Sequence, residues 1–367
     1  MHPRRILGGL LALVPAVCGA GPKDYGDVTQ PTQVTVQLQN VPPKAVFDEI
    51  ARQTGQPFVT QPANLWEKSP GAPIGIDVKD QPYWVAMKDV CGKAGISLKY
   101  PTDTAEPRVI LARDNQDWTS YPTVTSGPFM VSLIGLHRAS TVDMRKPRDI
   151  QRTFYAKFTI FCEPRFRLLR APLTAKIDEA VDDKGNSLVV KNAPEEPMNF
   201  VTSWVYNMEG KLEYPKSPGT KIARLRASAK FLAQTKSETI EFSDPLTSRN
   251  VTKTVAGRKI TVKEIRRTPE EYQATVTFER GEIPPAQWEQ TVFPGNTLRL
   301  IDGDGKMILA KGFGLGGKGD EATYVFKFEK EPPRGSRIGK PLKLEWEIPT
   351  ETKEIPLQFE FKDLPLP

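Results

Sequence analysis

The chain has 367 residues, which is long for one domain and typical of two or three. Its 38% hydrophobic and 26% charged residues exclude a disordered protein and a protein with many membrane spans. Only two histidines are present, His2 and His137, which excludes a histidine-rich metal site and disfavours catalysis by histidine. The net charge of +7 is modest for this length, so composition does not indicate a nucleic-acid partner.

The first twenty residues have the layout of a secretory signal peptide. Arg4 and Arg5 precede an apolar stretch over residues 6–17, and small residues follow up to Ala20. The apolar stretch is too short for a membrane span, and no transmembrane segment is expected after cleavage behind Ala20. Val17 fits poorly before a lipid-modified Cys18. We therefore expect an exported protein of the periplasm or cell surface without a lipid anchor.

A repeat with an offset of 40 residues lies between residues 34 and 100. Residues 34–42 align with residues 74–82, and in both segments apolar and polar residues alternate, which predicts a half-buried strand. Each segment ends in Pro after Asn40 or Asp80, and these side chains are expected to cap a following helix. Gly55 and Gly95 are expected to end the two helices. With a closing strand at 108–112, residues 32–113 are predicted to form a duplicated β-α-β module.

The segment Leu38-Gln-Asn-Val-Pro-Pro-Lys-Ala-Val-Phe-Asp-Glu-Ile-Ala-Arg-Gln-Thr-Gly55 resembles the secretin and TonB short N-terminal domain. That family comprises small α/β modules at the periplasmic ends of outer-membrane secretins and of some TonB-dependent receptors. The resemblance covers residues 32–113 and implies protein–protein contact in the envelope, without chemistry. Domains of this family usually precede a β-barrel or a secretin core, and nothing later in this chain resembles either. The partners of those proteins therefore do not transfer to this chain.

Short strands separated by turn clusters fill the rest of the sequence, and they predict two sandwiches. The second is expected to resemble an immunoglobulin-like module, with seven strands that end at Gln358–Phe361. The predicted fold class is α+β multidomain, a duplicated β-α-β module followed by two mostly-β domains. The predicted division is signal peptide 1–20, flexible N-terminus 21–31, module 32–113, linker 114–127, β-sandwich 128–243 and immunoglobulin-like sandwich 244–367.

Motifs that could carry chemistry are better explained as turns and loops. Asp302–Lys306 begins like a calcium loop but lacks the glycine and the glutamate that such a loop needs. Gly312–Gly317 matches the spacing of a dinucleotide-binding loop, but a strand pattern follows it where a helix is required. His137 has no recognisable nucleophile motif. We therefore predict no catalytic residue, no metal and no cofactor.

Cysteine and arginine patterns leave two alternatives each. Cys91 and Cys162 could pair in an oxidising compartment, but they fall in different predicted domains, which favours two separate buried thiols. Basic residues alternate at 165–167 and 224–230, so each set shares one face of a strand. Such a stripe could give a weak attraction to anionic surfaces, although a solvated face of a sandwich is the favoured interpretation.

Trp66, Tyr83 and Trp84 lie outside the alternating positions of the repeat, so they are candidate interaction residues as well as candidate core residues. The leading hypothesis is a non-enzymatic envelope protein, an adaptor that binds unidentified envelope proteins through a strand edge or this aromatic cluster. One alternative is a structural spacer of an envelope assembly. The other is a hydrolase acting on envelope polymers, for which the sequence supplies no constellation of residues.

Overall fold

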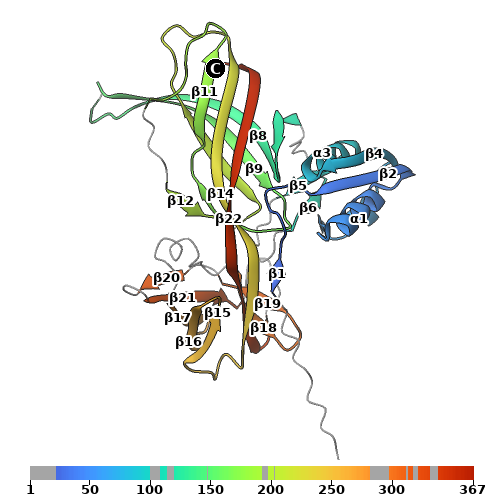
Figure 1. Cartoon of the computed structure of the whole chain (residues 1–367), viewed down its shortest axis with the longest axis vertical. Helices are drawn as coiled ribbons and strands as arrows, with labels where there is room; N and C mark the ends of the chain where they lie inside the picture. Colours follow the sequence, from blue (N-terminus) through green and yellow to red (C-terminus); the bar gives the residue numbers. More distant parts are fainter. Residues whose placement is uncertain are drawn as a thin grey trace, which may run out of the picture.

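The structure is a computed structural model, and its fold is mostly β, with strands in several sheets (Figure 1). It describes residues 22–99, 108–113, 120–146, 148–191, 197–201, 203–281, 297–310, 313–316, 321–330 and 338–367. The predicted signal peptide, residues 1–20, lies outside the described residues. No helix among those described is long and apolar enough to cross a membrane.

Residues 33–112 hold all the described helices. Their elements are β2 (Gln33–Val41), α1 (Pro43–Thr54), β3 (Val59–Gln61), α2 (Leu65–Lys68), β4 (Ile74–Pro82), α3 (Tyr83–Ala94), β5 (Ser97–Lys99) and β6 (Ile110–Ala112). Strand β2 pairs antiparallel with β4, while β6 pairs with β3 and β5 in a second small sheet. We call this part the N-terminal module. Its core consists of the apolar faces of α1, α3, β2 and β4.

The ends of the two long helices confirm one local prediction and correct another. Gly55 and Gly95 follow α1 and α3 with φ of 66° and 61°, the left-handed conformation expected of a terminating glycine. Asn40 and Asp80 do not cap the helices, because the cap positions are the prolines two residues later, which make no side-chain hydrogen bond. Both polar residues instead adopt positive φ, 54° and 47°, near the ends of β2 and β4.

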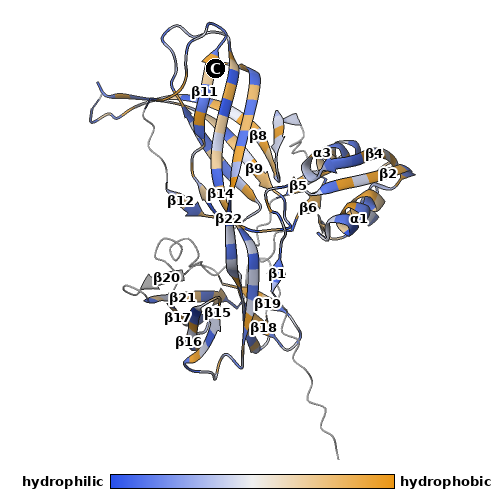
Figure 2. Ribbon diagram, in the orientation of Figure 1, coloured by the Kyte–Doolittle hydropathy of each residue, from blue (hydrophilic) through white to orange (hydrophobic). Residues whose placement is uncertain are grey.

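Two facing sheets form the first sandwich. One has the order β13-β9-β8-β7, with β7 (Thr123–Ser126), β8 (Phe129–Val142), β9 (Ile150–Cys162) and β13 (Val205–Leu212). The other contains β10 (Leu168–Pro172), β11 (Lys176–Asp182), β12 (Met198–Phe200), β14 (Lys221–Ser243) and β22 (Pro341–Pro365). Apolar and polar residues alternate along these strands (Figure 2), and their inward side chains form one core. Residues 123–126, predicted as linker, are therefore a strand of this sandwich.

The second sandwich is built on the same long strands. Its other sheet has the order β15-β16-β17-β21-β20, with β15 (Val251–Val255), β16 (Arg258–Arg267), β17 (Glu271–Glu279), β20 (Phe313–Gly316) and β21 (Glu321–Glu329). Strands β18 (Leu298–Asp302) and β19 (Met307–Leu309) extend the shared sheet, because β18 pairs with β22. The core of this sandwich includes the ends of β14 and β22.

A continuous two-stranded ribbon joins the two sandwiches, and this differs from the predicted division at residue 243. Strands β14 and β22 pair from Lys221 with Pro365 to Ser243 with Lys343. The final strand, predicted at Gln358–Phe361 in the second sandwich, packs in the core of the first. In both strands the buried positions change between odd and even numbers where the register shifts, near Lys236 and Glu351, so alternation alone does not reveal a continuous strand. A bulge adds one residue to a strand and so shifts the alternation by one.

Residues 22–31, predicted as a flexible terminus, are anchored at this bulge. β1 (Lys23–Asp24) pairs with β14, and the Tyr25 amide donates to the Thr235 carbonyl, 3.0 Å away. The Tyr25 hydroxyl donates to Glu347 Oε1 at 2.6 Å. Gln234 and Ser237 also donate to that oxygen, at 3.0 and 2.9 Å. A buried carboxylate needs such donors, because an unpaired one would be costly away from water.

The surroundings of Glu347 favour its charged form. Burial alone raises the pKa of this carboxyl, but the positive charge of Arg167 and the hydrogen bond from Tyr25 outweigh burial and lower the pKa to about 2. Burial and the nearby Glu347 carboxylate raise the pKa of Tyr25 to about 12. Tyr25 is thus a neutral donor to a charged acceptor over the whole physiological range.

We predict that Glu347 makes folding stability depend on acid. Its pKa is lower in the folded chain than its ordinary value of 4.5, so its stabilisation is complete above that pH and is lost as pH falls toward 2. The difference corresponds to roughly 3 kcal/mol of unfolding free energy. Glu347→Gln should remove this part of the pH dependence, as measured by denaturant unfolding at several pH values. Glu351→Gln removes an exposed ion pair with Lys236 and is the control. This variant should keep the acid dependence of the unfolding free energy. Equal acid dependence in both variants would contradict the prediction.

Candidate functional site

Trp84 fixes the N-terminal module to the first sandwich. Its side chain is 1% exposed, and its ring stacks on Trp204 with centroids 5.8 Å apart and lies 5.7 Å from Phe161. The indole nitrogen donates to the Pro128 carbonyl at 3.2 Å. Because indole buries a large apolar surface and carries a single donor, this contact satisfies both parts of the side chain.

The sandwich completes the core of the module. Met130, Phe161 and Trp204 belong to the same apolar cluster as α1, α3 and the β2–β4 sheet. In return, the Trp204 indole nitrogen donates to the Arg108 carbonyl of the module at 2.9 Å. Figure 1 shows the module beside β8 and β9, at the side of the sandwich. The contact is therefore an extension of a hydrophobic core, unlike the polar contacts typical of mobile domains.

The three predicted interaction residues have different positions. Trp84 and Tyr83 are buried within the chain, so their rings are not exposed to an external partner. Trp66 is half-buried and packs on Phe47, with centroids 5.7 Å apart. Sequence reasoning identified the aromatic positions but missed Trp204. Trp204 lies just before β13 and Phe161 lies on β9, and no local sequence pattern marks either residue as a partner of Trp84.

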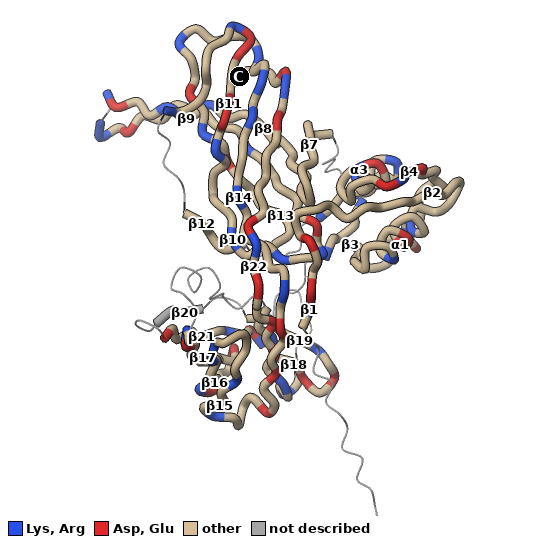
Figure 3. The backbone as a smooth tube through the Cα atoms, viewed as in Figure 1, with Lys and Arg blue, Asp and Glu red and all other residues tan. Residues whose placement is uncertain are grey.

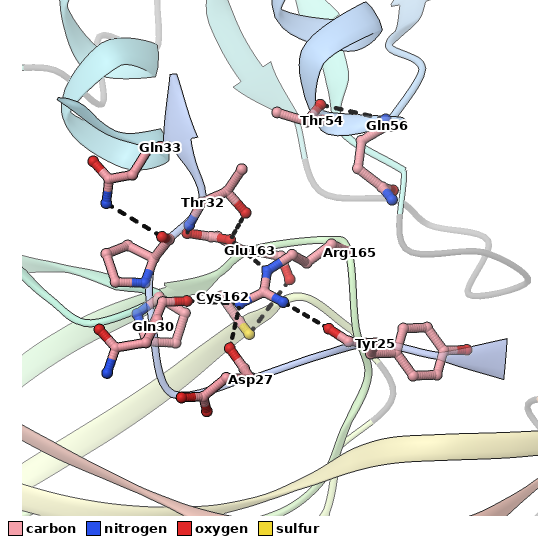
Figure 4. Close-up of polar contacts among 12 residues, drawn as sticks. Tyr25, Asp27, Gln30, Thr32, Gln33, Thr54, Gln56, Cys162, Glu163 and Arg165 are labelled. Carbon is pink, nitrogen blue, oxygen red and sulfur yellow. Dashed lines mark hydrogen bonds and ion pairs between the residues drawn. The ribbon is translucent and has the colours of Figure 1, made fainter. Parts of the chain in front are cut away.

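A polar cluster beside Trp84 ties the N-terminal segment to the same junction (Figure 4). Glu163, 1% exposed, accepts hydrogen bonds from the amide and the hydroxyl of Thr32, at 2.9 and 2.6 Å. Arg165 donates to Glu163 at 2.9 Å. The same guanidinium also donates to the carbonyls of Tyr25, Asp27 and Gln30 at 2.9, 3.1 and 2.6 Å. Arg165 therefore holds the chain segment that leads into β2.

Burial dominates the titration of this junction. Burial raises the pKa of Glu163, although hydrogen bonds from Thr32 and Arg165 oppose the rise. The pKa of the Tyr83 hydroxyl is well above its ordinary value because of burial and the Glu163 carboxylate. Both thiols, Cys91 and Cys162, are free and buried, and burial raises the pKa of each. The prediction of separate thiols is confirmed, and thiols held protonated in this way are poor nucleophiles.

A groove of about 760 Å³ lies where α3 meets β7. The helix contributes Trp84, Val85, Lys88, Asp89, Gly92 and Lys93, and the sandwich contributes Thr123–Thr125 and Met130. Lys88 Nζ donates to the Thr123 hydroxyl and links the two walls. Val85 is 37% exposed, so the helix presents an apolar side chain at the groove. Within the described part of the chain, β7 pairs with β8 alone and forms the edge of its sheet.

A second groove, of about 630 Å³, lies on the sandwich between β8, β9, β13 and the residues that follow β10. Ile134 and Leu173 are exposed there, beside Lys157 and Glu209. Each of the two grooves includes a single acidic side chain among its described residues, Asp89 in the first and Glu209 here. Glycoside hydrolysis requires two carboxyl groups that face each other, so neither groove supplies that pair.

The motifs set aside in the sequence occupy turns and strands. Asp302 and Lys306 close the turn between β18 and β19, and the Asp302 carboxylate accepts the amides of Asp304, Lys306 and Gly339. These hydrogen bonds occupy the carboxylate oxygens of Asp302 and stabilise the turn. Residues 313–316 of the glycine-rich motif form β20, and the rest of that motif lies outside the described residues. His137 is exposed on β8 and stacks on Tyr155.

The predicted cationic stripes are paired with acids. Arg224 contacts Glu179 at 3.2 Å, Arg226 contacts Glu360 at 3.0 Å, and Lys230 lies 3.9 Å from Glu354. Arg165 is engaged by Glu163 and by backbone carbonyls, as described above. These partners neutralise much of the positive charge on the two stripes. The two stripes therefore do not support the predicted weak attraction to anionic surfaces.

Comparisons with family models, with curated proteins and with solved structures give no match to this chain. The resemblances of residues 32–113 and of the second sandwich therefore stay predictions.

We predict that Trp84 and Trp204 stabilise the chain as a coupled pair. Each substitution to Ala should lower the unfolding free energy by about 3–5 kcal/mol, because it leaves a large cavity in the shared core. In a double-mutant cycle, the two substitutions should show a coupling of about 1 kcal/mol, since stacked rings contribute beyond their buried area. Circular dichroism during denaturant unfolding measures all four states. The control cycle uses Trp66→Ala with Trp204→Ala. Coupling that is equal in both cycles would contradict a specific contact.

Proposed function

We propose that this chain is an exported, non-catalytic protein of the bacterial cell envelope that binds a protein partner at the groove between α3 and β7. The observation that carries the proposal is the position of an edge strand beside an exposed apolar residue, Val85, and charged residues on α3. An extended segment of a partner can add to a free strand edge through backbone hydrogen bonds. Residues of α3 would then contact the side chains of that segment and select it.

The sequence supports the setting of this proposal. Residues 1–20 have the pattern of a signal peptide, and residues 32–113 repeat a strand-helix-strand pattern that resembles the secretin and TonB short N-terminal domain. The equivalent helices α1 and α3 share their glycine ends and their proline starts. An interaction module of an envelope protein is the function that this resemblance implies. In this chain, α3 is the helix that borders the groove.

The continuous β14–β22 ribbon favours a second candidate, a structural spacer. Its two paired strands run from one core into the other without a linker between them, as a spacer requires. The two candidates are compatible, because a rigid body can also hold a binding groove in a fixed orientation. The hydrolase alternative gains no support from the two grooves described above.

The proposal predicts that Val85→Asp weakens partner capture by about tenfold or more, because an aspartate places a charge in the contact. The assay is capture from detergent-solubilised envelope extract, quantified for each partner band. Val59→Asp is the matched control, because Val59 is 36% exposed on β3 and does not line the groove. A photo-reactive residue in place of Thr125 should cross-link the same partner.

Substitution tests the groove better than removal of the module. Without the module, Phe161 and Trp204 would lose their apolar cover and could bind proteins nonspecifically. Partner capture that is unchanged by Val85→Asp, or reduced equally by Val59→Asp, would contradict binding at this groove.

A further inference from the structure

A two-stranded arm extends from the first sandwich. It consists of residues 137–142 at the end of β8 and 150–155 at the start of β9, joined by the turn that follows Val142 (Figure 1). Six residues per strand reach about 20 Å at ordinary strand rise. Except for Asp143, every described residue from His137 to Thr153 is exposed. From His137 to Thr153 no described residue belongs to the core, so packing does not explain the length of the arm beyond Phe154.

The base of the arm is fixed to the sandwich. The Arg138 guanidinium lies over the Tyr214 ring at 3.6 Å, and the Phe154 ring meets Tyr214 with centroids 5.3 Å apart. His137 stacks on Tyr155 across the strands, 5.3 Å away. These contacts direct the ribbon away from the body of the sandwich, and the tip is the part of the ribbon farthest from that body (Figure 1).

The tip combines positive charge with exposed apolar side chains. Met144 is 83% exposed, and the cross-strand pair Val142 and Ile150 is 43% and 47% exposed. Arg145, Lys146, Arg148 and Arg152 lie near them in the chain, outnumbering Asp143 and Asp149, and both blue and red segments mark the tip in Figure 3. Arg145 pairs with Asp143 at 2.8 Å, whereas Lys146, Arg148 and Arg152 have no acidic partner among the described residues.

Protection of a free strand edge does not explain this composition. Charged residues alone discourage pairing between exposed edges, and exposed Val, Met and Ile work against that protection. The combination of unpaired basic residues with apolar side chains at one tip is what a membrane surface binds. Headgroup phosphates attract the cations, and the apolar side chains enter the interface below them.

We infer that this arm docks on membranes that contain anionic phospholipids, by insertion of Met144, Val142 and Ile150 beneath a ring of headgroup contacts from Lys146, Arg148 and Arg152. A flat surface contacts only the tip, where these residues gather. The arm lies apart from the groove between α3 and β7. A failure of membrane binding would therefore not contradict partner binding at the groove, and the reverse also holds. In the envelope, the arm would orient the chain on a membrane, with the groove exposed to a partner.

The test is co-sedimentation with vesicles of equal parts phosphatidylcholine and phosphatidylglycerol, compared with phosphatidylcholine alone. The protein is the chain from Gly21 onward, which contains every described residue and lacks the apolar segment 6–17 that could itself bind lipid. We expect binding to the anionic vesicles alone, weakened by added salt. Changing Lys146, Arg148 and Arg152 to Gln should weaken it by tenfold or more, because each basic residue near an anionic surface contributes about fivefold.

Matched controls separate the arm from general charge and from folding. Changing the exposed Lys68, Lys79 and Lys216 to Gln removes the same charge elsewhere and should leave vesicle binding unchanged. An environment-sensitive label on the Met144→Cys variant should shift to the blue on anionic vesicles, and the same label on Met307→Cys, in the second sandwich, should not. Labelling is selective because both native thiols are buried.

Three results would overturn the inference. Equal binding to neutral and anionic vesicles would exclude headgroup recognition. Equal losses in the arm variant and in the control variant would show that net charge acts, without a role for the arm. Arm substitutions that change the mass of the chain in solution, and leave vesicle binding intact, would make the arm an interface between copies.

Discussion

The pairing of β14 with β22 is the constraint on which the rest of the structure depends. These strands cross both sandwiches, so each core rests on the same hydrogen-bonded ribbon. At the midpoint, bulges change which residues face inward, and the buried carboxylate of Glu347 is held there by donors from β14 and from the N-terminal segment. The second sandwich therefore cannot be separated from the first without breaking strands, although the sequence reads as two successive domains.

The N-terminal module is attached by a different kind of contact. The indoles of Trp84 and Trp204 stack within one apolar cluster, and Arg165 ties the incoming chain beside them. The attachment creates the groove between α3 and β7, because neither the module nor the sandwich contains both walls. The candidate binding site is thus a product of docking. Its shape depends on the rigidity of that contact.

The sequence predicted local structure correctly where a single residue determines the backbone conformation, as at a helix end or a tight turn. Gly55 and Gly95 end their helices because a left-handed residue is needed there, and the turn at Asp302–Lys306 follows from its side-chain and glycine chemistry. The β14–β22 ribbon was not predictable, because bulges interrupt the alternation, and Pro349 and Pro356 in β22 argue against a continuous strand. The candidate site was found only in part. Trp84 was singled out, but its partner Trp204 lies 120 residues away, and no local pattern connects the two.

The Trp84–Trp204 contact and the β14–β22 ribbon should hold the module and the two sandwiches as one rigid body, and a distance measurement tests this most directly. In the chain from Gly21 onward, spin labels on Val59→Cys in the module and Met307→Cys in the second sandwich occupy exposed positions, while Cys91 and Cys162 are buried. Pulsed electron paramagnetic resonance should then give a single narrow distribution of label-to-label distances. A broad or multimodal distribution would show that the parts move independently and would contradict the account.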